Sequence, residues 1–239
     1  MNANALKALS MLAAGAMALA WPGCSGSERS QGGGALKGSE FVQLPPPKLD
    51  GSMSLEKAIL QRRSVRTYTS EPLTISQISQ LLWAAQGVTE PKRGLRSAPS
   101  AGALYPLEVY VVAGKVDGLA PGVYKYHAEG HKLLKTADKD KRAELVDAAL
   151  GQSCVRDAPA SIVFSAVYER TRARYGERAS RYVHIETGHA AENVCLQAVA
   201  LKLGSVCVGA FDDSEVRKVL SLPSEEQPLY ILPVGRRKS

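Results

Sequence analysis

A single long helical pattern, Ser180 to Leu203, constrains the fold of this chain more than any other feature of its sequence. The pattern places apolar residues on most sides of the helix, among them Val194, Leu196 and Leu201. A helix that is apolar nearly all round has to be buried, because an exposed helix keeps a polar face toward water. In a chain of 239 residues, we therefore expect this helix at the centre of the domain or of a dimer.

The composition is that of a soluble globular protein with one sizeable core. Hydrophobic residues make up 45% of the chain and charged residues 22%, which excludes wholesale disorder. No internal repeat is visible, so solenoid, propeller and collagen architectures are excluded as well. The net charge of +7 is a modest surplus that suits a phosphate-bearing ligand or an anionic surface as well as nucleic acid.

The first 24 residues read as an export signal rather than as part of the fold. A lone Lys7 precedes an apolar run from Ala13 to Ala20, which is too short to span a membrane. Cys24 follows directly after small residues and resembles the lipidated cysteine of a bacterial lipobox. We favour a lipidated Cys24 over plain cleavage of the signal.

A flexible linker is predicted over residues 25–48, because Ser25 to Ser39 is rich in Gly and Ser and Pro45 to Pro47 follows. Residues 49–239 then form the folded domain. Together these segments predict an exported protein, periplasmic or in the cell envelope, that is tethered to the membrane by lipid.

The cysteines exclude a disulfide scaffold. With Cys24 modified by lipid, Cys154, Cys195 and Cys207 remain, and these can form at most one disulfide. All three lie in apolar surroundings, where a buried free thiol is the commoner state.

No metal site is predicted. His127 and His131 are separated by a turn signal, and Glu186 to His189 is a single Glu-x-x-His where a di-iron bundle needs two. The fingerprints of serine hydrolases, zinc proteases, P-loop enzymes and dinucleotide-binding domains are all absent from the sequence.

Periodicity and turn residues predict an α+β fold in which strands are scattered among helices. The further helices expected are Leu55–Leu60, capped by Ser54, Ser76–Gln86, Lys139–Leu150 and Ser214–Leu220. The strands expected are Leu107–Ala113, Gly122–Tyr126, Lys132–Leu134, Ser161–Ala166, Val206–Val208 and Leu229–Val234.

Three short clusters have residue types suited to binding a phosphorylated, planar ligand. Arg62, Arg63, Ser64 and Arg66 place three guanidinium groups and a hydroxyl just past a helix, which suits a phosphate monoester. On its own, such a run is more often a solvated basic face.

The other two clusters are a loop and the chain end. The loop Ser97–Pro106 has small residues that let backbone amides approach a planar ligand, although alone it is simply a turn. Gly235, Arg236 and Arg237 add a basic pair directly after a predicted strand, where a disordered tail is the usual alternative.

In combination these motifs resemble the nitroreductase superfamily. The series continues with Arg174-Tyr175-Gly176, Glu186-x-Gly188-His189 and Val208-Gly209-Ala210-Phe211, so that the resemblance covers Leu55 to Arg237. Within the superfamily, the chain is most similar to the branch that contains the dehydrogenases of thiazole- and oxazole-modified peptides, the azoline dehydrogenases.

The resemblance implies an α+β fold with a mixed or antiparallel sheet flanked by helices, and a homodimer with two FMN molecules at the subunit interface. It implies an FMN-dependent oxidoreductase that transfers a hydride or electron pair between a donor and a small-molecule acceptor, with no nucleic-acid partner. The implied FMN-binding residues are Arg62, Arg63, Ser64, Arg66, Pro99, Ser100, Ala101, Gly102, Leu104, Gly209, Ala210, Gly235, Arg236 and Arg237.

Within that set, the resemblance assigns Arg62, Ser64, Arg66 and Arg236 to the phosphate. Pro99 to Leu104 would line the isoalloxazine or ribityl side, and Gly209 and Ala210 would give backbone contacts near the reactive edge of the ring. The basic groups would neutralise the phosphate and the small residues would let the ring lie against backbone.

One departure concerns the candidate catalytic residue. Azoline-forming members have a Lys-Tyr pair where this chain has Arg174-Tyr175, and an arginine is a poor base for removing a Cα proton. Tyr175 could still donate a proton to a reduced substrate, or it could be a packed tyrosine with no chemical role.

Two alternatives stay open. The scarcity of acid and base groups is compatible with a catalytically idle flavin-binding lipoprotein, and the branch resemblance is compatible with a dehydrogenase of azoline-type modified peptides.

Overall fold

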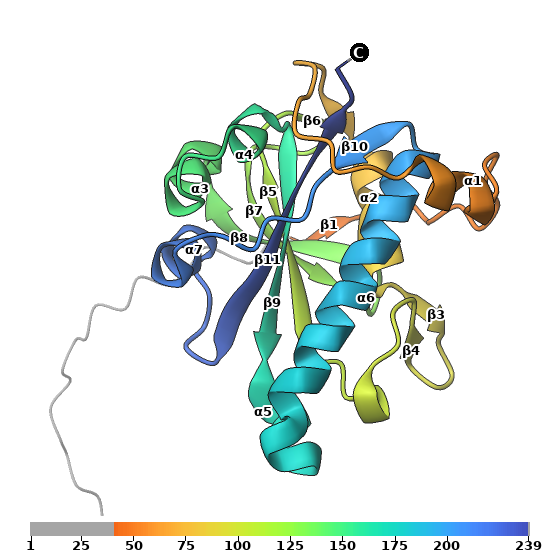
Figure 1. Cartoon of the computed structure of the whole chain (residues 1–239), viewed down its shortest axis with the longest axis vertical. Helices are drawn as coiled ribbons and strands as arrows, with labels where there is room; N and C mark the ends of the chain where they lie inside the picture. The colour runs from red at the N-terminus through yellow and green to blue at the C-terminus, as the bar shows by residue number, and fades with distance from the viewer. Residues whose placement is uncertain (1–40, 239) are drawn as a thin grey trace, which may run out of the picture. The chain divides into compact units, whose positions relative to one another are not determined.

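The computed structural model describes residues 41–238, coloured in Figure 1. The predicted signal and the first part of the predicted linker lie outside the described residues. No helix within residues 41–238 has both the length and the apolar character needed to cross a lipid bilayer.

A seven-stranded sheet in the order β1-β8-β7-β5-β9-β11-β10 forms the centre of the described domain, and all neighbouring strands in it are antiparallel. Two short two-stranded pairs, β2 with β6 and β3 with β4, lie outside this sheet. The strands are β1 Phe41–Gln43, β2 Leu73–Thr74, β3 Val88–Glu90, β4 Leu95–Arg96, β5 Leu107–Ala113, β6 Val116–Asp117, β7 Gly122–His127, β8 Lys132–Asp138, β9 Ala160–Val167, β10 Leu203–Ser205 and β11 Glu226–Arg236.

Helices cover both faces of the sheet, with α2 and α6 on one side and α3, α4 and α7 on the other (Figure 1). Successive side chains of β5 point to opposite faces of the sheet. Val109 and Val111 belong to the core under α2 and α6, whereas Tyr110 and Val112 belong to the core under α3, α4 and α7. The helices are α1 Leu55–Gln61, α2 Ile75–Gln86, α3 Arg142–Ala148, α4 Ser153–Asp157, α5 Tyr168–Tyr175, α6 Ala179–Ala200 and α7 Asp213–Leu220, with short 3₁₀ turns at Ala101–Ala103 and Gly176–Arg178.

This architecture confirms the predicted fold class, α+β with an antiparallel sheet flanked by helices. The predicted strand at Leu107–Ala113 is present with the same bounds. The helix predicted after Ser54 is also confirmed, because the Ser54 side chain accepts a hydrogen bond from the Lys57 backbone N–H.

The long central helix is confirmed at its start and wrong at its end. It begins at Ala179 but stops at Ala200, because Lys202 adopts a left-handed φ of 59° and Leu203 begins β10. Its inner face is fully buried against α2 and the sheet, whereas its outer face leaves Ile185 48% exposed. The single chain therefore buries one face of this helix, and its position at the centre of a dimer stays a prediction.

Several other boundaries differ from the prediction, since β8 and β11 are longer than expected, and three of the differences change an element or the limit of the domain. The helix expected at Lys139–Leu150 is shortened to α3 because Lys139 and Leu150 both have left-handed φ values, of 69° and 58°. The strand expected at Val206–Val208 lies earlier, as β10, and Val208 makes only a single bridge to Ile231.

The third difference concerns the predicted linker. Its last part contains β1, which pairs with β8 at the edge of the sheet, and Leu44, which is buried. The apolar Phe41, Val42 and Leu44 give this segment enough apolar surface to add to the sheet, so the folded domain begins before residue 49.

Candidate active site

One turn of α6 contacts two of the predicted clusters and the segment that leads into Gly209. An arginine of the basic cluster, the backbone of the small-residue loop, and the segment that leads into Gly209 each contact this turn. The contacts are Arg62 Nε to Glu192 Oε1 at 3.5 Å, Asn193 Nδ2 to Ser97 O at 3.3 Å, and Cys195 Sγ to Cys207 Sγ at 3.8 Å.

The two basic clusters lie side by side, although about 170 residues separate them in the sequence. Ser64 forms a parallel bridge with Ser205, and the Val65 N–H donates to Ser205 O at 2.9 Å. Ser205 belongs to β10, whose partner strand β11 ends at Arg236. A second contact, from Thr69 N–H to Arg236 O at 3.0 Å, fixes the same neighbourhood.

Tyr68 fastens these two segments from the inside. Its hydroxyl donates toward Val65 O at 2.6 Å and lies 3.1 Å from Pro233 O. Burial raises the pKa of this tyrosine well above its ordinary value, so it stays protonated as a donor. A Cβ at Gly235 would come within 2.8 Å of the Tyr68 ring, which explains why glycine stands there.

Positive charge is in surplus at this end of the sheet. Arg62 pairs with Glu192, and Arg236 pairs with Glu71 at 2.9 Å. Within residues 41–238, Arg63, Arg66 and Arg237 have no carboxylate partner. All three are exposed, and Arg63 donates to the carbonyls of Leu60 and Arg62 at the end of α1. A set of unpaired guanidinium groups beside the exposed Ser64 hydroxyl fits an anion such as a phosphate monoester.

From its contact with Asn193, the small-residue loop Ser97–Pro106 runs alongside α6 toward the N-terminus of that helix. The loop backbone is strained at Ala103 and Tyr105, which have left-handed φ values of 54° and 46°, whereas Gly102 adopts its φ of 62° without strain. Such conformations persist where the surrounding structure imposes them, often at functional sites. Pro99 and Gly102 are exposed, and Ser100, Ala101 and Leu104 are half-buried.

Tyr175 lies directly against this loop. A Cβ at Gly102 would come within 2.8 Å of Arg174 Nη1 and 3.0 Å of Tyr175 Oη. The Tyr175 ring also packs edge-on against Tyr182, with the ring centres 4.9 Å apart. The candidate proton donor and the loop predicted to line the flavin are therefore neighbours, and the left-handed φ of Gly102 is the reason that glycine is favoured there.

Glu186 is a buried carboxyl between the two ends of the site. It is 2% exposed and accepts a hydrogen bond from Gln86 Nε2 at 3.2 Å. Burial raises its pKa to about 7, and hydrogen bonds from Ser100 and Gln86 oppose that shift only in part. Glu186 was named from the sequence as part of a motif. Its burial and its raised pKa could not be predicted there, because both arise from the packing of other elements around it.

Gly209 and Ala210 present backbone groups to solvent. Just before them, Val208 and Ile231 exchange backbone hydrogen bonds of 2.8 and 3.0 Å, and Gln152 Nε2 donates to Ala210 O at 2.8 Å. Within residues 41–238, the N–H groups of Gly209 and Ala210 have no acceptor, and both residues are exposed. Free N–H groups at this position suit the predicted contacts to a polar ring edge.

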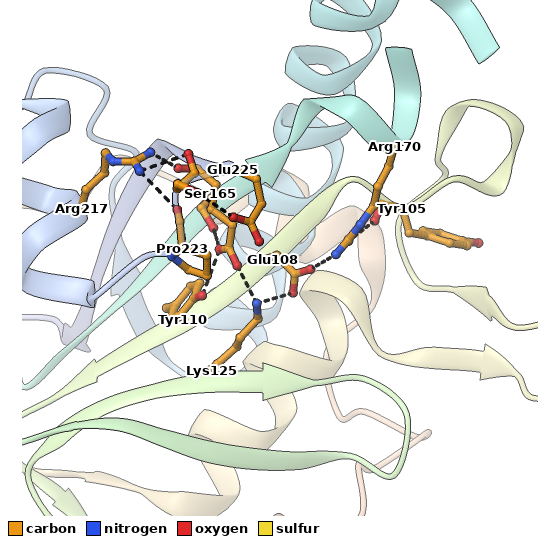
Figure 2. A network of polar contacts seen from close by, with 11 residues as sticks. Tyr105, Glu108, Tyr110, Lys125, Ser165, Arg170, Arg217, Pro223 and Glu225 are labelled. Carbon is orange, nitrogen blue, oxygen red and sulfur yellow. Dashed lines mark hydrogen bonds and ion pairs between the residues drawn. The ribbon is translucent and has the colours of Figure 1, made fainter. Parts of the chain in front are cut away.

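A buried ionic network that sequence reasoning missed fixes the far end of the loop (Figure 2). Glu226, at the start of β11, accepts from Tyr110 Oη at 2.9 Å, Ser165 Oγ at 2.7 Å and Lys125 Nζ at 2.6 Å. Its carboxyl is 2% exposed, so it depends on these donors.

The same network reaches the loop through Glu108. Lys125 Nζ lies 3.3 Å from Glu108 Oε2, Arg170 also pairs with Glu108, and Arg170 donates to Tyr105 O at 3.0 Å. Polar residues inside predicted strands were the available signal, because Glu108 and Tyr110 share one face of β5 and Lys125 lies in β7.

The two halves of the predicted site lie at different heights along α6. Arg62 contacts the helix at Glu192, and Tyr175 contacts it at Tyr182. Ten residues of helix correspond to about 15 Å at 1.5 Å per residue. The basic clusters meet each other and the loop meets Tyr175, but one chain does not place the basic clusters against Tyr175.

The comparison with protein families decides what this arrangement belongs to. The family model described as the nitroreductase family matches residues 59–236, which is most of the chain. The chain belongs to the nitroreductase family. This confirms the resemblance predicted from the motifs, and it makes the protein an oxidoreductase.

Individual members of the nitroreductase family agree with this assignment. A protein of Methanocaldococcus jannaschii named as a nitroreductase is 47% identical over 196 residues, covering 82% of this chain and 96% of its own length. The crystal structure of a protein from Ralstonia eutropha JMP134, also described as a nitroreductase, superimposes with a TM-score of 0.73 at 30% identity, covering 83% of this chain and 90% of that one.

Two more distant relatives are named for different activities, peptide processing and FMN reduction. The microcin B17-processing protein of Escherichia coli is 28% identical over 155 residues, covering 63% of this chain and 57% of its own length. The FMN reductase [NAD(P)H] of Bacillus subtilis is 24% identical over 195 residues, covering 75% of this chain and 64% of its own. The first of these confirms the distant similarity to the peptide-modifying branch.

Proposed function

We propose that this protein is an FMN-dependent oxidoreductase that moves a hydride or electron pair between a donor and a small-molecule acceptor. The observation that carries the proposal is the meeting of Arg62–Arg66 with Gly235–Arg237 across β10, where several guanidinium groups have no carboxylate partner. Similarity to an FMN reductase supports flavin as the ligand of this cluster.

The residues present fit FMN at three points. Arg62, Ser64, Arg66 and Arg236 would hold the phosphate, with the exposed Arg237 beside them, and Pro99 to Leu104 would lie along the ring or the ribityl chain. The free N–H groups of Gly209 and Ala210 would donate to the polar edge of the ring. When bound, FMN supplies the two-electron chemistry, and the protein supplies binding, orientation and electrostatics.

The side chains at the other end of α6 would act on protons. Tyr175 Oη lies beside Gly102, so a substrate that rests on this loop would find a phenol proton donor there. Arg174 lies next to it as a permanent cation, which can steady negative charge but cannot remove a proton.

The first test measures flavin content and affinity. Residues 40–239 should purify yellow with about one FMN per chain, and Arg62→Ala or Arg66→Ala should each weaken FMN binding by about 1.5–3 kcal/mol, the range for hydrogen bonds to charged groups. Arg93→Ala is the control, because Arg93 is an exposed arginine that pairs with Glu90 away from the basic clusters.

Fluorescence titration with FMN measures these affinities. A colourless protein that does not bind FMN would contradict the cofactor proposal. Unchanged affinity in both Arg62→Ala and Arg66→Ala would move the phosphate to another place on the protein.

Electron donor and acceptor are tested by the visible spectrum. Bleaching of bound flavin by NADH, NADPH or a quinol, followed by recovery on adding an acceptor, would distinguish an enzyme from a catalytically idle flavin-binding lipoprotein. The peptide-dehydrogenase alternative is supported by similarity to the microcin B17-processing protein. Arg174 is evidence against the peptide-dehydrogenase alternative, because an arginine cannot serve as the base that removes a Cα proton.

A homodimer belongs to the same proposal. α1 packs on α6, and together they expose Leu55, Ile59, Leu60 and Ile185, which are 48–71% exposed in the single chain. Exposed large apolar side chains on packed neighbouring helices are typical of a subunit interface.

The proposed location outside the cytoplasm rests on residues 1–40 alone, which lie outside the described residues. A lipidated Cys24 on a Gly/Ser leash would hold the flavin site near the membrane surface, where a quinone or another envelope redox partner is available. Cys24→Ser should release the protein from the membrane fraction. If wild type and variant both stay in the cytoplasm with Met1 intact, the signal proposal fails and a nicotinamide donor becomes the better hypothesis.

A further inference from the structure

Cys195 and Cys207 form a contact pair that the proposed flavin chemistry does not use. Cys195 lies on α6 and Cys207 lies two residues after β10, with their sulfur atoms 3.8 Å apart. Cys195 is buried at 5% exposed, and Cys207 is partly exposed. A disulfide requires the sulfurs to close to about 2.05 Å, so side-chain movements of about 1 Å on each side are enough.

The surroundings favour one thiolate in this pair. The hydrogen bond from Cys207 and the charge of Arg62 both lower the pKa of Cys195, and the hydrogen bond is the larger cause. The same hydrogen bond, together with burial, raises the pKa of Cys207. Cys195 is therefore the more readily ionised thiol of the pair, but only Cys207 is accessible from solvent, so Cys207 is the attacking cysteine and the buried Cys195 is the resolving one.

We propose that Cys195 and Cys207 are a reversible redox pair that exchanges with an external low-molecular-weight disulfide or dithiol. In the oxidising direction, the partly exposed Cys207 loses its proton and attacks one sulfur of the external disulfide, which releases the other as a thiol and leaves a mixed disulfide on Cys207. The Cys195 thiolate then attacks Cys207 Sγ, which releases the second external thiol. Two protein thiols are oxidised and one external disulfide is reduced to two thiols.

The pair lies where its state affects the candidate site. Cys207 is two residues from Gly209, and Cys195 is on the turn of α6 that contacts Arg62 through Glu192. A disulfide would join α6 covalently to the segment that leads into Gly209 and Ala210. The exchange itself requires no flavin, so its test is independent of the proposed function.

The test uses the full-length protein with Cys24→Ser, which leaves three cysteines. After incubation with glutathione disulfide and alkylation of the remaining thiols, trypsin separates the two cysteines because it cleaves after Lys202. We expect the peptides 182–202 and 203–217 to be recovered joined within one chain, and the number of free thiols to fall from three to one. Dithiothreitol should restore all three.

Cys154 is the matched control within the same molecule. It is as buried as Cys195, at 4% exposed, but within residues 41–238 no other sulfur contacts it, so it should be alkylated only after unfolding and never joined. In Cys195→Ser, a mixed disulfide with glutathione should accumulate on Cys207. Recovery of both peptides as free thiols after excess glutathione disulfide, or joined only between chains, would overturn the proposal, and this measurement needs no variant in the pair.

Discussion

At the residue scale, a buried carboxyl links the two ends of the candidate site. Glu186 lies between the turn of α6 that contacts Arg62 and the turn that contacts Tyr175, and it is hydrogen-bonded to Gln86. Its pKa of about 7 means that it changes charge near neutral pH, where an ordinary glutamate is already ionised. This titration has a consequence for stability that can be measured directly.

Glu186→Gln should change how stability depends on pH. The folded state holds the Glu186 proton up to a pKa of about 7, whereas the unfolded chain loses it near the ordinary value of 4.5. The free energy of unfolding contributed by this group is therefore complete below pH 4.5 and is lost as the pH rises to about 7, by about 3 kcal/mol in total. Urea unfolding from pH 4.5 to 8 should show the variant without that loss, and parallel curves for both proteins would contradict the shifted pKa.

A second residue-scale prediction concerns Lys125. Lys125→Met would leave Glu226 buried with its charge and without its cation, which should cost about 3–5 kcal/mol of stability. The control is Lys141→Met, because Lys141 pairs with the exposed Glu144 and should cost at most about 1 kcal/mol. Denaturant unfolding of the two variants measures both. Equal losses of stability in the two variants would mean that the ionic network in Figure 2 stabilises the fold no more than an exposed ion pair does.

At the element scale, helix termini explain why α2 begins where it does. Thr74 accepts a hydrogen bond from the Gln77 N–H at 3.2 Å, and the Gln77 side chain accepts one from the Thr74 N–H at 2.9 Å. This reciprocal cap satisfies two backbone donors at once. α2 packs on α6, so its start also positions the helix that carries the candidate site.

Thr74→Ala should lower the free energy of unfolding by about 1 kcal/mol, because it removes the capping oxygen while Gln77 stays in place. Thr74→Ser keeps the oxygen and should restore most of the loss. Thermal or urea unfolding of the three proteins tests the pair, and a Thr74→Ser variant as unstable as Thr74→Ala would point to the methyl group rather than the cap.

At the scale of the whole molecule, the exposed apolar face of α1 and α6 predicts association between two copies. Ile59 is 57% exposed on α1, and Leu150 is a comparable exposed leucine, 68% exposed, in the turn after α3. Ile59→Asp should convert a dimer to a monomer, because a charge in an apolar interface is left desolvated and unpaired. Leu150→Asp should leave the dimer intact. Light scattering at micromolar protein concentration measures the mass of each protein in solution. A monomeric wild type would contradict the proposed interface.

Much of the fold and of the family assignment could be predicted from the sequence alone, because the signals are local. Ser54 and Gly87 mark the ends of their helices, and the alternation over Leu107–Ala113 defines β5. The order of the motifs from Arg62 to Arg236 was enough to identify the nitroreductase family, which the family model then confirmed.

Only the tertiary structure decided which of these residues meet. The contact of Ser64 with Ser205 brings two basic clusters together, and no local pattern records a pairing over that separation. The burial of Glu186, the network around Glu226 and the 3.8 Å contact of Cys195 with Cys207 arise in the same way. Burial, pKa and sulfur–sulfur distance depend on neighbours contributed by other elements, so they exist only once the sheet and α6 have packed.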